Sequence, residues 1–386
     1  MDTLDQIARH CQAAEPSARD WRCVFGWRGT DVKPDPANEP GLQSSGADPA
    51  LAENLRKQIP RLAAIERSAV SDDRVLALTL PRSAYGGAQG LAEAFGCALI
   101  RESDDSEHWW AMPALDRPEA ARTLKIRKNW MTEGFPKKAR EAIRFARAAT
   151  QGRYPIHQLV TGGIVDTASF VLGYQQLLEA FYTRPKDVHL LLRIVTDVLA
   201  EYIAACREAA GELVPDHVPT MTHGYTLCSE VRAVLSVEHF EEFEERYLED
   251  LSRAVGPLCI HSCGDWSRHL PSMPRDGTFV GADFGLPEMN WPRAAEWIGA
   301  AFWIHPHPSS NTQVVFSNWS DFFYHFGRHM RPENRVVISL GADHVDDYNA
   351  VCDRLAAEGC LPPQLASIGR IDLPAWARPA AEQQEK

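Results

Sequence analysis

The chain has 386 residues, of which 45% are hydrophobic and 24% charged, and its formal net charge is −12. This composition is typical of a folded globular protein, and the acidic balance disfavours nucleic acid as a partner. No stretch approaches the roughly 18 consecutive apolar residues that a membrane span needs, and the amino end lacks a secretory signal pattern. We therefore expect a cytoplasmic protein that does not bind membranes.

The amino-terminal part differs in composition from the rest of the chain. Residues 33–49 hold four prolines, two glycines and two serines, which is typical of a loop. We expect residues 1–70 to form a cap of helices and loop, residues 71–373 to form the main domain, and residues 374–386 to form a flexible tail.

Short β-rich runs alternate with amphipathic helical runs through the main domain. The clearest helix spans 185–211, with a proline in its first turn and a glycine after its last turn, and a second helix spans 236–255. The expected strands are 75–80, 97–100, 156–163, 218–225, 257–264, 279–285, 301–308 and 335–342.

Eight strands that alternate with helices favour an α/β fold of the (β/α)8 TIM barrel type, extended at its amino end by the helical and loop cap. An open, doubly wound sheet is disfavoured, because no glycine-rich dinucleotide fingerprint follows the first strands. In such a barrel the chemistry takes place at the carboxyl ends of the strands. The polar residues expected there are Thr161, Thr222, His223, Tyr225, His261, Cys263, Asp283, His305, His307, Asp343 and His344.

Two pairs in this set have a spacing of two residues, so each pair faces one side of its strand. His261 and Cys263 form one pair, and His305 and His307 form the other. Imidazole and thiolate are preferred zinc ligands, and a catalytic zinc keeps three protein ligands and one open position. The alternative for His261 is a hydrogen-bonded core histidine beside an inert cysteine, and His305 and His307 are equally compatible with a hydrogen-bonded loop pair.

Several segments together resemble a known family. The segment LCIHSCGDWSRHLPSM, residues 258–273, is similar to the H-x-C-G motif of the uroporphyrinogen decarboxylase-like superfamily, in its zinc methyltransferase branch. Residues 162–197 and 228–243 resemble further signature segments of this family, and residues 335–344 occupy the place of its last strand. The resemblance covers roughly residues 75–360 and implies the same barrel.

The resemblance implies that His261 and Cys263 are zinc ligands. In the methyltransferase branch the third ligand is a cysteine on the last strand, but this chain has Ala342 at that position. We therefore expect the neighbouring Asp343 or His344 to be the third ligand. The other candidates at strand ends are His305, His307, Cys228 and Glu230.

The implied function is that of a zinc-dependent methyltransferase, which activates a thiol to accept a methyl group from a corrinoid or a small methylated donor. The chain has no corrinoid-binding segment of its own, so a corrinoid would come on a partner protein. The sequence does not set the oligomeric state, but barrels of the resembled family often pair, which is compatible with a homodimer. Tyr225, Trp266 and Trp303 are expected as apolar walls of the substrate pocket, with core packing as the alternative for each. Arg82 is a candidate to bind an anionic group of the substrate, with an exposed loop arginine as the alternative.

Two other functions stay open at this point. One is a decarboxylase or lyase that acts on a small organic acid, with Asp283, His223, His305 and His307 as acids and bases. Decarboxylation of uroporphyrinogen itself is disfavoured, because the arginine-rich R-Q-A-G-R pattern is missing. The other function is that of a metal-binding relative without catalysis, which has lost the third ligand.

Overall fold

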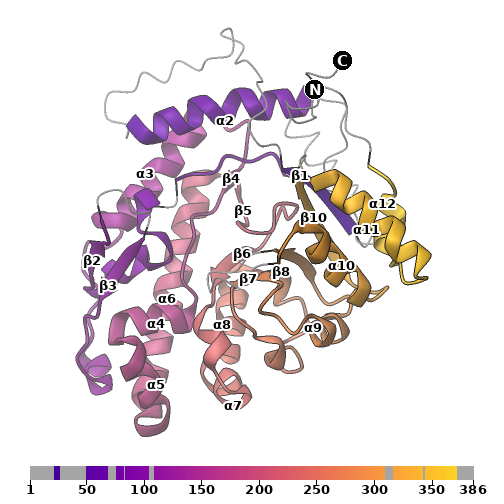
Figure 1. Ribbon diagram of the computed structural model, residues 1–386. Helices are drawn as coiled ribbons and strands as arrows, with labels where there is room; N and C mark the ends of the chain where they lie inside the picture. The colour runs from indigo at the N-terminus through magenta and orange to yellow at the C-terminus, as the bar shows by residue number, and fades with distance from the viewer. Residues whose placement is uncertain are drawn as a thin grey trace.

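The computed structural model describes residues 21–26, 49–67, 75–81, 83–103, 108–308, 316–341 and 344–371. The strands of its main sheet are Trp21–Gly26 (β1), Tyr225–Cys228 (β6), Leu258–Ser262 (β7), Phe279–Gly285 (β8), Trp303–His307 (β9) and Arg335–Gly341 (β10). They lie in the order β1-β10-β9-β8-β7-β6 and are all parallel (Figure 1). A parallel sheet in this order requires a crossover connection after each strand.

Two further segments continue the sheet beyond β6. Gly162 forms a parallel bridge with Cys228, and Leu78 forms one with Ile156 of the short strand β4 (Ile156–His157). Strand β4 also pairs in parallel with β5 (Leu213–Val214). Together with the segments around Leu78 and β4, the six strands form the eight strands of a (β/α)8 barrel, which is the fold of the chain.

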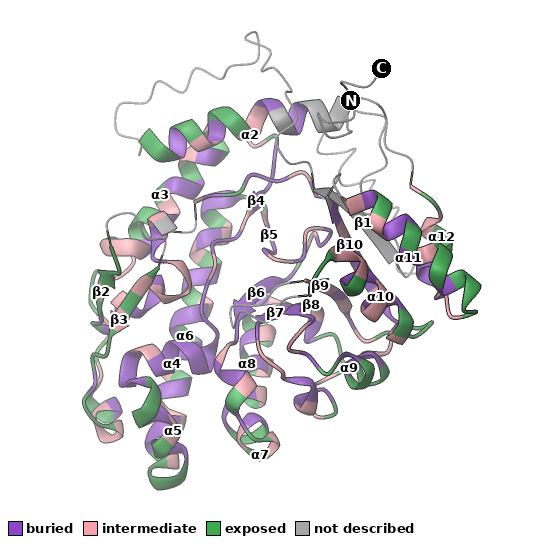
Figure 2. Cartoon of the chain, in the orientation of Figure 1, coloured by how far each residue is buried: buried purple, intermediate pink, exposed green. Residues whose placement is uncertain are grey.

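Helices cover the outside of the sheet, and their inner faces carry the buried residues (Figure 2). They are α2 (Pro49–Arg67), α3 (Gly134–Ala149), α4 (Ile164–Leu172), α5 (Tyr174–Thr183), α6 (Pro185–Ala210), α7 (Val237–Phe240), α8 (Arg246–Val255), α9 (Trp291–Ile298), α10 (Trp319–His329), α11 (Val345–Ala357) and α12 (Pro363–Ile368). Helix α6 begins at Pro185 and ends at Ala210, before Gly211, which has a φ of 73°, as expected from the sequence. None of the described helices combines the length and apolar character of a membrane span.

The expected strand at 97–100 lies outside the barrel. It forms strand β2 (Ala98–Arg101), which pairs antiparallel with β3 (Trp109–Met112). A strand of a parallel barrel is buried on both faces, whereas β2 and β3 leave Ile100 and Trp110 about half exposed. The eighth strand of the barrel is instead β1, which comes from the region expected to be a cap. The domain boundary at residue 70 stays a prediction, but the first 70 residues do contribute a strand to the sheet.

The expected strand at 218–225 is also different in the structure. The chain forms the short strands β5 and β6, and the loop between them folds into the barrel. Val218 and Met221 of this loop pack against Cys259 of β7 and Val337 of β10. Because β7 and β10 are not neighbours in the sheet, the loop fills the interior between them, below the carboxyl ends of the strands.

Candidate active site

Four polar residues share one register across four consecutive strands. Cys228 of β6 pairs with His261 of β7, His261 pairs with Asp283 of β8, and Asp283 pairs with His305 of β9. Side chains in register on neighbouring parallel strands point to the same face. All four residues lie among the last three positions of their strands, which is where barrel enzymes place their catalytic groups.

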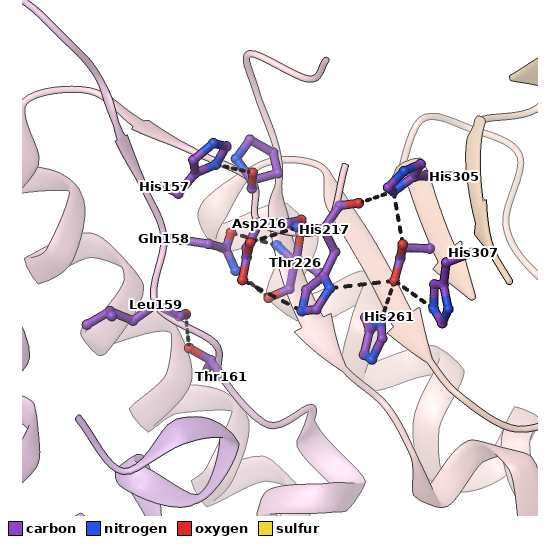
Figure 3. Close-up of polar contacts among 12 residues, drawn as sticks. His157, Gln158, Leu159, Thr161, Asp216, His217, Thr226, His261, His305 and His307 are labelled. Carbon is purple, nitrogen blue, oxygen red and sulfur yellow. Dashed lines mark hydrogen bonds and ion pairs between the residues drawn. The ribbon is translucent and has the colours of Figure 1, made fainter. Parts of the chain in front are cut away.

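Asp283 lies at the centre of a group of histidines. Its carboxylate accepts a hydrogen bond from Nδ1 of His261, and its Oδ2 lies 3.0 Å from Nδ1 of His305. Its Oδ1 also lies 3.5 Å from Nδ1 of His217 and 3.6 Å from Nε2 of His307 (Figure 3). Burial alone would raise the pKa of Asp283, but the hydrogen bonds from His261 and His305 hold it well below its ordinary value. Asp283 is therefore a buried anion.

The second ring nitrogen of His261 faces Glu230 and Cys263. Its Nε2 lies 3.3 Å from Oε1 of Glu230 and 3.5 Å from Sγ of Cys263. Tetrahedral zinc with ordinary bond lengths separates a nitrogen from an oxygen ligand by about 3.3 Å, and a nitrogen from a sulfur ligand by about 3.5 Å. The three donor atoms all lie within 4.8 Å of one another. Their types and spacing therefore fit a zinc centre with three protein ligands.

Electrostatics at this place also favour a cation. Burial alone would lower the pKa of His261, but its contacts with Asp283, Cys263 and Glu230 raise it well above its ordinary value. Burial alone would raise the pKa of Glu230, but its hydrogen bonds with His261 and with the backbone of Cys263 lower it. The carboxylates of Glu230 and Asp283 thus stabilise positive charge on the imidazole between them.

Two other groups of possible ligand atoms include His261 as well. One group consists of His217, Cys228 and His261, and the other of His261, Asp283 and His307. In the second group His261 and Asp283 are in direct hydrogen-bond contact, which is closer than two ligands of one ion. A carboxylate in that position orients a ligating histidine through its other nitrogen. The set of Glu230, His261 and Cys263 therefore fits a single metal ion better than the set of His261, Asp283 and His307.

Buried contacts fix the loop that carries Glu230. Oδ1 of Asp166 on α4 accepts hydrogen bonds from the backbone of Glu230 at 2.8 Å and of Val231 at 3.3 Å. Arg232, one residue further on, donates to Glu244 at 2.9 Å, and both side chains are fully buried. The side chain of Glu230 is 40% exposed, and its carboxylate is held by the backbone of Cys263 at 2.8 Å.

The structure brings five of the predicted site residues together: His261, Cys263, Asp283, His305 and His307. Glu230 and Cys228, which were predicted only as alternatives for the third ligand, are also in this cluster. His217 was not predicted at all. It lies in the loop that folds into the barrel, and the sequence holds no signal for such a fold.

Four other predicted residues lie elsewhere. The expectation that His223 lies at the carboxyl end of a strand is wrong, because β6 begins only at Tyr225 and His223 is exposed in the turn before it. Tyr225 and Trp266 are fully buried in the core, and Trp303 packs against the cluster around Val218. Core packing is the contact that the structure shows for these aromatic residues, and their role as pocket walls stays a prediction.

Of the two expected third ligands, His344 is described, and it lies away from the group around His261. The ring of His344 stacks on Trp319 at 4.2 Å, its Nδ1 lies 3.7 Å from Asp347, and it belongs to none of the three groups of ligand atoms. Asp343 and Arg82 lie outside the described residues. Among the described residues, Glu230 stands where a third ligand is needed.

Comparisons with known proteins identify the family and the fold. The family model of uroporphyrinogen decarboxylase (URO-D) matches residues 88–285, just over half of the chain. Among solved structures, a methyltransferase from Methanosarcina mazei is similar, with a TM-score of 0.59 and 18% sequence identity. The match covers 88% of this chain and 94% of that chain, and at this identity it shows a shared fold. No curated protein matches the chain.

Proposed function

The chain belongs to the uroporphyrinogen decarboxylase family, and we propose that it is a zinc-dependent methyltransferase that transfers a methyl group to a thiol. The methyl donor is a corrinoid, carried by a partner protein, or a small methylated compound. The observation that carries the proposal is the group of Glu230, His261 and Cys263 at the carboxyl end of the barrel, with the spacing of zinc ligands.

The donor set suits zinc in its chemistry as well as its spacing. It combines an imidazole nitrogen, a thiol and a carboxylate, and zinc accepts all three. Zinc bound by these residues would hold the thiol of the substrate as the thiolate at neutral pH. In the transfer the thiol loses its proton and its sulfur forms the bond to the methyl group, while the bond to the donor breaks with its electron pair left on the donor.

The protein residues position this chemistry and exclude water from it. Asp283 fixes the ring of His261 through Nδ1, so that Nε2 points towards Glu230 and Cys263. The backbone of Cys263 donates to Oε2 of Glu230 at 2.8 Å, which ties two of the proposed ligands together. His261 and Cys263 are less than 10% exposed, whereas Glu230 is accessible. We infer that substrates approach from the side of Glu230.

The cluster around Asp283 favours a second candidate function. His305 and His307 contact a buried carboxylate at the strand ends, which is an arrangement suited to acid and base catalysis. A decarboxylase or lyase that acts on a small organic acid would use these groups without thiol methylation. A metal-binding relative without catalysis would bind zinc and carry out neither reaction.

Metal analysis and a transfer assay together test the proposal. The protein is purified after expression with zinc, its metal content is measured, and it is incubated with methylcobalamin and a small thiol. We expect about one zinc per chain and a methyl thioether in the mass spectrum, with both lost in Cys263→Ser. Cys360→Ser, a change just after the turn that follows α11, is the matched control and should keep both. A protein that is metal-free and forms no thioether contradicts the proposal, and zinc without thioether supports the metal-binding relative.

A further inference from the structure

His217 lies against the ring of the central proposed ligand. Its ring centroid is 4.0 Å from that of His261, and the two ring planes are 16° apart. Figure 3 shows the two imidazoles next to each other, with His217 coming from the loop between β5 and β6. Two stacked rings at this separation are in van der Waals contact, so His261 cannot tilt towards His217.

His217 is itself held on several sides. Its backbone N–H donates to Oδ1 of Asp216 at 2.9 Å, and its carbonyl accepts from Nδ1 of His305 at 2.6 Å. Its ring lies between two carboxylates, with Nε2 3.6 Å from Asp216 and Nδ1 3.5 Å from Asp283. The backbone contacts fix the position of residue 217, and its ring lies between these two carboxylates beside the ring of His261.

The backbone of His217 is strained. Its φ is 63°, and among the described residues only one other residue that is not glycine, Gln151, has a positive φ. Residues other than glycine rarely adopt this backbone conformation, and such strain often occurs at functional sites. Glycine at 217 would relieve the strain but would remove the ring that contacts His261.

We propose that His217 is a positioning residue that sets the ring plane of His261, an inference that rests on the proposed metal site. The lone pair of Nε2 lies in the plane of the imidazole ring, so a tilt of the ring directs it away from the metal. The hydrogen bond to Asp283 fixes one edge of the ring, but leaves it free to rotate about that contact. The stacked ring of His217 blocks this rotation in the direction of His217.

Cobalt binding tests this role, because Co²⁺ adopts zinc sites and its visible spectrum reports ligand geometry. The variants are His217→Gly, which removes strain and ring together, and His217→Asn, which tolerates the left-handed backbone but has no ring. Gln151→Gly is the matched control, since it relieves the same backbone strain in an exposed turn after α3. Co²⁺ affinity, visible spectrum and the melting temperature of the metal-free protein are measured for each.

We expect both His217 variants to bind Co²⁺ about 10- to 100-fold more weakly, with a changed visible spectrum, while Gln151→Gly binds as the wild type does. The melting temperature of metal-free His217→Gly should not fall, which separates positioning from folding. Wild-type affinity and spectrum in either His217 variant would overturn the inference. So would X-ray absorption that shows one nitrogen ligand fewer in the variants, since His217 would then be a ligand. If the wild type binds no Co²⁺, the proposed function fails as well.

Discussion

His261 donates its Nδ1 hydrogen to Asp283, its partner in register on the next strand, and this contact leaves Nε2 as the nitrogen available for a metal. The two residues stand side by side because β7 and β8 are parallel neighbours, so the orientation of the proposed ligand follows from the pairing of two strands. A carboxylate at this position raises the basicity of a ligating histidine and fixes its tautomer.

Asp283→Asn should weaken zinc binding by about 10- to 100-fold. The amide keeps the shape of the carboxylate but loses the charge that orients and polarises His261. Competition with a chromophoric chelator measures the affinity. Asp346→Asn, an exposed change on α11, is the matched control and should bind zinc as the wild type does. Unchanged affinity in Asp283→Asn would contradict the assigned role of this carboxylate.

Glu230→Gln and His344→Ala compare two candidates for the third ligand. Because a neutral amide is a poor zinc ligand, we expect Glu230→Gln to lower zinc affinity strongly. We expect His344→Ala to leave affinity unchanged, since His344 stacks on Trp319 away from the cluster. The same chelator competition serves for both. If His344→Ala lowered zinc affinity and Glu230→Gln did not, His344 would be the third ligand, as the sequence favours.

Glu244→Gln should destabilise the fold by about 3–5 kcal/mol, because it leaves the buried guanidinium of Arg232 without its counter-charge. Urea denaturation measures this loss. The exposed pair of Arg253 and Asp250 gives the comparison, and Asp250→Asn should cost less than about 1 kcal/mol. Equal effects of the two changes would show that the buried pair does not anchor the loop that carries Glu230.

Glu245 should make stability depend on pH. Burial, together with Glu249 and Glu241, raises the pKa of Glu245 from 4.5 to about 7 in the folded protein. The folded state therefore holds the proton on the Glu245 carboxyl more tightly than the unfolded state does. The stability that this proton contributes is complete below pH 4.5 and is lost as the pH rises through 7. Glu245→Gln should raise the melting temperature at pH 8 and leave it unchanged at pH 4. An equal shift at both pH values would rule out titration as the cause.

The barrel could be predicted from the alternation of strands and helices, but one predicted strand lies outside it and one of its actual strands was missed. The run at 97–100 has the apolar character of a strand, yet only its partner β3 makes it an antiparallel hairpin outside the barrel. The run at 21–26 is surrounded by loop-like sequence, and only its pairing with β10 makes it a strand of the barrel. Strand partners far apart in sequence decide both cases.

The site was predictable where it depends on strand periodicity. His261, Cys263, Asp283, His305 and His307 follow from their places near strand ends, which the local sequence shows. Glu230 was one alternative among several, because its place depends on how Asp166 and Glu244 hold the loop after β6. His217 was out of reach, since a loop that folds into a barrel carries no periodic signal.

Anomalous scattering at the zinc edge from crystals of the zinc-loaded protein tests the central claim most directly. The account predicts one peak, within bonding distance of Oε1 of Glu230, Nε2 of His261 and Sγ of Cys263. No peak near these atoms, or a peak between Asp283 and His307 instead, would contradict it.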